Sequence, residues 1–230
     1  MDVHPGPGRQ LPIHESAVTL MVELRDLVAD AAKLFVQNHG FTRTGRNFVR
    51  QDEPVRVVRF RPVGLGGFDI VFNLGIAGIS EVLPKTDRWV VSCSAINLRP
   101  EGVPAVAWLR LTKGAYDEEV REHTKRVCES MADGFLLKFR DADEFYIWVR
   151  DSALELFRDP RADNEFRRLK LQPFNVVGPL ELAGVYAAHL GKADDALMLQ
   201  NAAIEFATAR GIDWVPRIIA NITAAGSRET

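Results

Sequence analysis

The sequence predicts an α+β fold in which an antiparallel sheet of about four to six strands packs against helices. An apolar stripe with helical spacing runs through residues 16–39, and apolar and polar residues alternate strictly over 68–76. Two further helical stripes follow at 117–139 and 141–158. Connections of hairpin length between the expected strands favour antiparallel pairing.

The first helix is expected over residues 16–39, where apolar residues recur at steps of three and four. Ser16 is the expected N-cap, because its hydroxyl can accept a hydrogen bond from a backbone N–H of the first turn. Gly40 supplies the left-handed residue that commonly ends a helix, and Phe41 then folds back on the last turn. The stripe consists of Val18, Met21, Leu24, Leu27, Val28, Ala31, Leu34 and Phe35.

The pattern changes to strands after this helix. The turn-like triplet 52–54 separates the first two of them, and the alternation from Phe68 to Ile76 indicates a half-buried strand. Its apolar residues are expected to face the helices. The expected strands occupy 47–51, 55–61, 68–76, 88–99 and, as a further candidate, 105–111.

Two features organise the C-terminal half. Asp141 and Glu144 have the spacing of a capping box, which predicts the start of a helix that ends before Pro160. Two helical stripes joined at Gly191 then predict a hairpin with the small-residue spacing of a tetratricopeptide repeat. The expected organisation is a flexible lead at 1–15, an α+β domain at 16–158, a linker at 159–173, a helical hairpin extension at 174–225 and a tail at 226–230.

A single helical hairpin needs a neighbour to cover its apolar stripe. That neighbour is either the rest of the chain or a second copy of it, which would make a homodimer. The residues expected to dock the hairpin are Leu182, Val185, Tyr186, Leu197 and Ile204.

Composition narrows the function classes. The 230 residues are 47% hydrophobic, and 29 lysines and arginines stand against 31 acids, for a net charge of −2. This balance argues against a dedicated nucleic-acid binder. Two cysteines, Cys93 and Cys128, without a CxxC motif predict a reduced, cytoplasmic protein. No apolar stretch has the length of a membrane span, and no signal peptide is recognised.

Arginines are concentrated in residues 43–61, which hold six of them against two acids. Strand alternation places Arg59 and Arg61 on one face, about 6.6 Å apart along the strand. At that spacing two guanidinium groups can converge on one phosphate or carboxylate. Asp69 and Asn73 lie on the polar face of the next strand and complete the candidate ligand site. The structural alternative is that these arginines are solvated edge residues or cross-strand partners of acids.

Catalytic, cofactor and metal motifs are not recognised. The five histidines form no HxH or HExxH pattern, and Cys93 has no histidine or acid anchored near it by the sequence. The glycine-rich segment 64–67 lacks the Lys-Ser/Thr ending of a phosphate-binding loop and precedes a strand. We therefore expect no cofactor and no metal, and the sequence identifies no catalytic residue.

Part of the chain resembles a known family. The run from Gly40 to Arg50, the strand 55–61 and the segment 68–76, which ends its strand in Asn-Leu-Gly, resemble the start of the domain of unknown function 4304 family. The resemblance continues through Trp108-Leu109, Asp117-Glu118-Glu119 and the run from Gly134 to Phe139, and so covers residues 16–158. It implies a fold only, because no activity of the family can be carried over residue by residue.

The function expected from these observations is binding. The protein would engage an anionic ligand or an acidic protein surface through the arginine-bearing strands, without intrinsic catalysis. The alternative is a small-molecule enzyme acting on an anionic substrate held by Arg59 and Arg61. A catalytic base beside the arginines would discriminate between the two functions.

Overall fold

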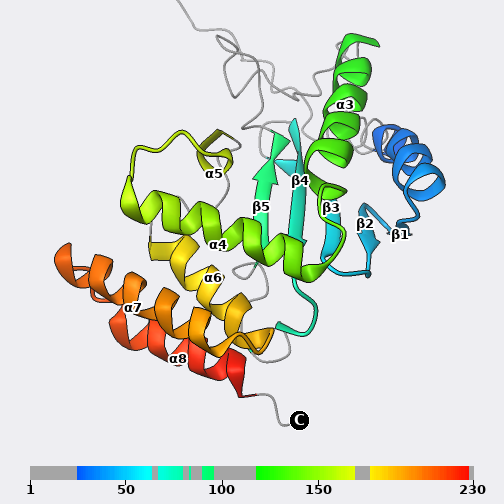
Figure 1. Ribbon diagram of the computed structural model, residues 1–230. Helices are drawn as coiled ribbons and strands as arrows, with labels where there is room; N and C mark the ends of the chain where they lie inside the picture. Colours follow the sequence, from blue (N-terminus) through cyan, green and yellow to red (C-terminus); the bar gives the residue numbers. More distant parts are fainter. Residues whose placement is uncertain are drawn as a thin grey trace, which may run out of the picture.

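The computed structural model describes residues 25–63, 67–79, 83, 90–95, 118–168 and 177–227. These residues form one five-stranded antiparallel sheet in the order β1-β2-β3-β4-β5, together with helices, which confirms the predicted α+β class. Each strand pairs with its neighbours in the sequence, as expected from the short connections. Figure 1 shows the C-terminal helices gathered at one end of the molecule.

The strands are β1 (Thr42–Thr44), β2 (Asn47–Arg50), β3 (Val55–Val63), β4 (Gly67–Gly75) and β5 (Val90–Ser94). The last four occur where the alternating pattern predicts strands. β1 was not predicted as a strand, because its three residues are all exposed and carry no apolar pattern. The further strand expected at 105–111, the ends of the strand expected at 88–99 and most of the glycine-rich segment 64–67 lie outside the described residues.

One face of the sheet carries the core. Phe68, Ile70, Phe72 and Leu74 of β4 are completely buried, as the alternation predicts. The first described helix, which we call the first helix, runs from residue 25 to 32 and continues as the π-helical segment η1 (Lys33–Asn38). The ring of Phe35 in η1 lies 5.5 Å from that of Phe48 in β2, so this helix covers the apolar face.

The end of the first helix follows its prediction. Gly40 has a left-handed φ of 69°, and Phe41 folds back so that its backbone N–H donates to Phe35 O at 2.9 Å. The two rings lie 5.3 Å apart. The bond spans six residues because the helix ends in a π-helical turn. The predicted start of this helix, including the N-cap Ser16, lies outside the described residues.

Two helical segments follow the sheet. α3 (Glu118–Met131) continues into the π-helical segment η5 (Ala132–Leu136), and α4 (Ala142–Arg158) comes next. The predicted cap is present, because the Asp141 carboxylate accepts the backbone N–H of Glu144 at 2.8 Å. The Glu144 carboxylate reaches back one residue further than in a standard capping box and accepts the N–H of Arg140 at 2.8 Å.

The described part of the predicted linker is attached to α4. It contains the short helix α5 (Glu165–Arg168). The ring of Phe166 lies 5.0 Å from that of Trp148 in α4, and Asn164 donates to Ser152 O at 3.1 Å. Residues 159–168 therefore pack as part of the α+β body, while 169–176 lie outside the described residues.

Three helices complete the described chain, namely α6 (Val177–His189), α7 (Ala193–Ala209) and α8 (Val215–Gly226). The first two form the predicted hairpin, which turns at Gly191 with a φ of 72°. α8 was not predicted as a separate helix. α6 contacts α4, α7 and α8, so its apolar residues occupy its whole circumference. Its buried carboxylate, Glu181, accepts from Arg217 at 2.8 Å and from Asn221 at 2.7 Å, both in α8.

The C-terminal helices dock on the rest of the chain through both rings and hydrogen bonds. The ring of Tyr186 lies 5.6 Å from that of Phe145 in α4, and the Tyr146 hydroxyl donates to Asp195 in α7 at 2.6 Å. This bond holds the pKa of Asp195 below its usual range. The His189 ring donates from Nε2 to Ala77 O at 2.8 Å, which joins α6 to the turn after β4.

Most of the residues expected to dock the hairpin do so. Leu182, Val185 and Tyr186 are buried, and Ile204 packs against the core while partly exposed. The expectation for Leu197 is wrong, because this residue is 58% exposed on the outer face of α7. The hairpin has its intramolecular neighbours in α4 and α8, and a homodimer through this region stays a prediction.

Replacing Phe72 by alanine tests the assignment of the core face. Phe72 is completely buried between the register partners Val58 and Cys93, so Phe72→Ala should lower the free energy of unfolding by about 3–5 kcal/mol. Val71→Ala on the opposite, half-buried face of the same strand is the control and should cost about 1 kcal/mol. Equal midpoints of urea unfolding for the two variants would contradict the assignment.

A second prediction concerns the close approach of α6 and α8. A Cβ at Gly184 would lie 2.6 Å from Cδ1 of Ile222, and such overpacking costs about 1–3 kcal/mol. Alanine also favours a helix by about 1 kcal/mol over glycine. Gly184→Ala should therefore be unfavourable or neutral alone and more favourable in an Ile222→Val background, which lacks Cδ1 but keeps Cγ1 at 3.2 Å. A double-mutant cycle by urea unfolding measures the coupling. Identical effects of Gly184→Ala in both backgrounds would show that Ile222 does not restrict this position.

Candidate functional site

The arginines of residues 43–61 divide between the two ends of the sheet. Arg50 and Arg56 are register partners on β2 and β3, next to the turn 52–54. Arg59 lies three residues after Arg56 in β3, on the opposite face, and pairs with Asn47 close to the β1–β2 turn. Arg61 follows on the same face as Arg59. The six arginines therefore do not form one basic surface.

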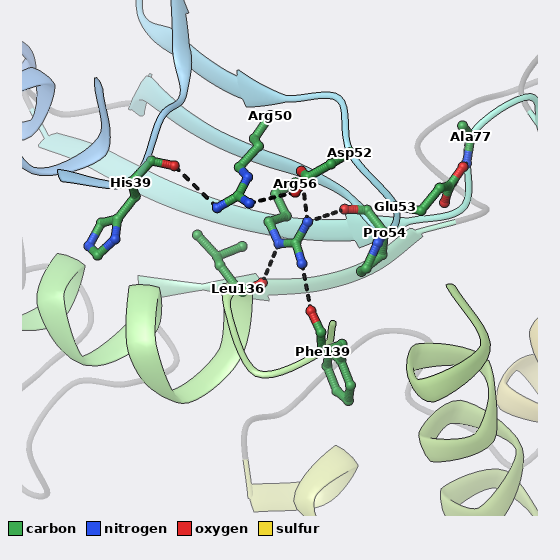
Figure 2. Close-up of polar contacts among 9 residues, drawn as sticks. All are labelled: His39, Arg50, Asp52, Glu53, Pro54, Arg56, Ala77, Leu136 and Phe139. Atoms are coloured by element: carbon green, nitrogen blue, oxygen red, sulfur yellow. Dashed lines mark hydrogen bonds and ion pairs between the residues drawn. The ribbon is translucent and has the colours of Figure 1, made fainter. Parts of the chain in front are cut away.

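Arg56 is buried on the helix-covered face, with 3% of its surface exposed, and is tied to the end of η5 and to the loop between η5 and α4 (Figure 2). Its Nε donates to Leu136 O at 2.7 Å, and its Nη2 donates to Phe139 O at 2.6 Å. Its Nη1 donates to Pro54 O at 2.7 Å and to the Asp52 carboxylate at 2.9 Å. Burial lowers the pKa of Arg56, and the nearby Asp52 carboxylate opposes this shift.

Arg50 completes the same polar cluster (Figure 2). It forms an ion pair with Asp52 at 2.6 Å and donates to His39 O, the residue after η1, at 3.3 Å. The neighbouring Glu53 accepts the backbone N–H of Ala77 at 3.1 Å. These bonds join the turn 52–54 to the first helix, to η5 and to the turn after β4. Arg50 and Arg56 thus serve the fold and are not available to a ligand.

Arg61 and Asp69 contact each other across β3 and β4, where they are register partners. Oδ2 of the buried Asp69 accepts from Nε of Arg61 at 3.1 Å and from Nη2 at 2.8 Å. Oδ1 accepts from the hydroxyl of Ser94 in β5 at 2.7 Å. The Arg61 side chain is 55% exposed, and Asp69 is its one charged partner among the described residues. The guanidinium is thus fixed along one edge, while Nη1 on its other edge makes no hydrogen bond to the described residues.

Arg59 and Asn73 lie on the same face but are not part of this contact. Arg59 is exposed, and its register partners are Asn47 and Val71. Asn73 is half-buried opposite Val57. Val57 precedes Arg59 by two residues and Arg61 by four residues along β3. The structure therefore unites Arg61 with Asp69, places Arg59 beside them along β3, and leaves Asn73 toward the other end of the face.

Two exposed arginines lie at the same end of the sheet as Arg59 and Arg61. Arg43 and Arg46 flank the β1–β2 turn, and Arg46 O accepts the N–H of Phe60 at 3.0 Å, which places this turn against β3. Arg43 donates from Nε to Gly45 O at 3.0 Å, within the turn. We call the four residues Arg43, Arg46, Arg59 and Arg61 the arginine end of the sheet.

Ser94 was missed by the sequence reasoning, although the alternation of Ser92, Cys93 and Ser94 already places both serines on the polar face. Cys93 itself is buried, and burial raises the pKa of its thiol to about 12. Cys128 is also buried, and burial raises the pKa of its thiol to about 12 as well. Neither thiol is suited to act as a nucleophile near neutral pH.

Within the described chain, no group of three or more histidine, cysteine or acidic side chains is arranged to hold a metal ion. The helices of this part of the chain are also too short or too polar for any of them to cross a bilayer.

Comparison with known proteins found no relative of this chain. No protein-family model, no curated protein and no solved structure matches the chain. The resemblance of residues 16–158 to the domain of unknown function 4304 family therefore stays a prediction from the sequence.

Arg56 and Arg46 form a matched pair for testing which arginines serve the fold. Arg56→Met keeps the apolar stem but leaves the carbonyls of Leu136, Phe139 and Pro54 without their donor. Removing one member of such a buried charged network costs about 3–5 kcal/mol. Arg46→Met changes an exposed residue and should stay within about 0.5 kcal/mol of the wild type. Urea unfolding measures both, and a similar small effect of the two substitutions would contradict the structural role of Arg56.

Proposed function

We propose that the protein binds an anionic group, a carboxylate or a phosphate, at the arginine end of its sheet, and that it acts through binding without catalysis. Arg61 is the principal contact, and Arg59 provides the second charge on the same face. The anionic group belongs either to a small ligand or to an acidic protein surface, since both present the same chemistry to a guanidinium.

The arrangement of Arg61 carries this proposal. The buried Asp69 carboxylate holds Nε and Nη2, and Ser94 holds the carboxylate in turn. A guanidinium fixed in this way loses less conformational entropy when it binds than a freely rotating side chain does. Its remaining donors are directed away from Asp69, where an anion can form charge-assisted hydrogen bonds with them.

Charge distribution supports the same surface. Four exposed arginines gather at this end of the sheet, where Arg61 forms an ion pair with Asp69. The two arginines that could have competed for the same ligand are fixed in the core-facing cluster at the other end. The net charge of the whole chain is −2, so this basic surface is a local feature.

An enzyme acting on an anionic substrate is the less supported alternative. A general base must lie within hydrogen-bond reach of the proton it removes and must have a free lone pair. Asp69 is the carboxylate beside Arg61; its oxygens already accept three hydrogen bonds from Arg61 and Ser94, and with 1% of its surface exposed it is shielded from a substrate proton.

The test compares two double variants that each remove two positive charges. Arg59→Ala with Arg61→Ala alters the proposed surface, and Arg158→Ala with Arg161→Ala removes two exposed arginines at the end of α4. Calorimetry at low salt with inorganic phosphate and with a polyglutamate peptide measures binding. Each lost guanidinium contact should remove about 1.5–3 kcal/mol of binding free energy, and binding by the wild type should weaken as salt is added.

Binding of phosphate would indicate a small anionic ligand, and binding of the peptide alone would indicate an acidic protein surface. Arg61→Lys keeps the charge but loses the fork of donors, so it should bind more weakly than the wild type. The proposal fails if neither probe binds the wild type, or if the Arg59 and Arg61 double variant binds as well as the control.

A further inference from the structure

A cleft of about 470 Å³ lies between the first helix and α3. Figure 1 shows these two helices beside each other. The lining residues recur at steps of three and four along both helices, from Leu27 to Asn38 and from Glu122 to Glu129. The cleft therefore follows the facing stripes of two helices. Its volume is in the range of about 300–1,000 Å³ that is typical of sites for small molecules.

The floor of the cleft is apolar apart from one hydroxyl. Leu27, Ala31 and Cys128 are buried and line it. Thr124 lines it as well, with only 4% of its surface exposed, and its Oγ1 is itself enclosed and has no hydrogen-bond partner in the described part of the chain. A buried hydroxyl without a partner is unfavourable, so a molecule in the cleft that pairs with this hydroxyl, once the side chain turns about χ1 toward it, would remove this cost.

The rim of the cleft carries charges of both signs. Lys33 and Lys125 are exposed there, as are Glu122 and Glu129. Asp30 also lines the cleft and lies 3.6 Å from Lys33 in an ion pair. Because opposite charges are mixed around the opening, the rim selects neither an anion nor a cation.

We propose that this cleft binds an uncharged, mostly apolar small molecule whose hydrogen-bonding group pairs with the Thr124 hydroxyl. The apolar floor supplies the favourable burial, and Thr124 supplies the orientation. This division of roles is typical of small-molecule sites, in which a few polar groups direct an otherwise apolar ligand. The proposal is independent of anion binding at the sheet.

N-phenylnaphthylamine is a suitable probe, because it is uncharged, has one N–H donor between two apolar ring systems and fluoresces more strongly in apolar surroundings. Its N–H would donate to Oγ1 of Thr124. We expect saturable one-to-one binding to the wild type. Thr124→Val keeps the shape of the side chain without the hydroxyl and should weaken binding about tenfold, the equivalent of one hydrogen bond at about 1.4 kcal/mol.

Thr124→Val should at the same time raise the thermal unfolding midpoint, because it removes a buried hydroxyl without a partner. Ala31→Leu fills the floor and should abolish saturable binding, while its unfolding transition stays cooperative. Thr208→Val on α7 and Ala220→Leu on α8 make the same two replacements at exposed positions and should leave binding unchanged.

Three results would overturn the proposal. The first is absence of saturable binding to the wild type. The second is unchanged binding in both cleft variants when they are folded. The third is a lower unfolding midpoint for Thr124→Val, since this would mean that the hydroxyl has a protein partner.

Discussion

The guanidinium of Arg56 joins the sheet to its helices, and the positions of the other arginines depend on it. Its donors serve carbonyls that lie 80 and 83 residues further along the chain, at the end of η5 and before α4. The Leu136 carbonyl belongs to a helix end, where backbone acceptors lack intrahelical partners, and the Phe139 carbonyl lies in the loop that follows. One buried cation therefore satisfies several groups that would otherwise be costly to bury, and it fixes where α4 begins relative to β3.

Strand alternation then determines what the remaining arginines can do. Because Arg56 faces the helices with Val58 and Phe60, Arg59 and Arg61 must emerge on the opposite face. A shift of one residue in register would exchange these roles and place two unpaired cations in the core. The same periodicity that secures the fold thus presents Arg61 to Asp69 and Ser94, and leaves one edge of its guanidinium available.

The sequence predicted those features whose causes are local. Alternation in residues 68–76 was sufficient to predict β4. Residue types at a few neighbouring positions were sufficient to predict the helix cap at Asp141 and the left-handed glycines Gly40 and Gly191. The role of Arg56 was missed because its partners are distant in the sequence, although alternation already places it on the core face. Leu197 was assigned to the wrong face because the packing partner of α7 is partly α8, a helix that was not foreseen. The cleft depends on how two distant helices approach each other, which periodicity does not determine.

The two ends of the sheet differ in how their polar groups are bonded. At one end, the Glu53 carboxylate accepts the N–H of Ala77, which joins the turn 52–54 to the turn after β4. The carbonyl of Ala77 accepts from the His189 ring of α6. The C-terminal helices are thereby attached to the end that Arg56 stabilises. The arginine end lies at the opposite ends of β3 and β4, where substitutions remove exposed charge without disturbing these bonds. Substitution of Arg59 therefore removes exposed charge at the other end of the sheet from the Arg56 cluster. Arg61→Ala leaves the buried Asp69 carboxylate with Ser94 as its remaining partner and should also lower stability, so Arg61→Lys, which keeps the charge but loses the fork of donors, is the variant that separates binding geometry from the fold.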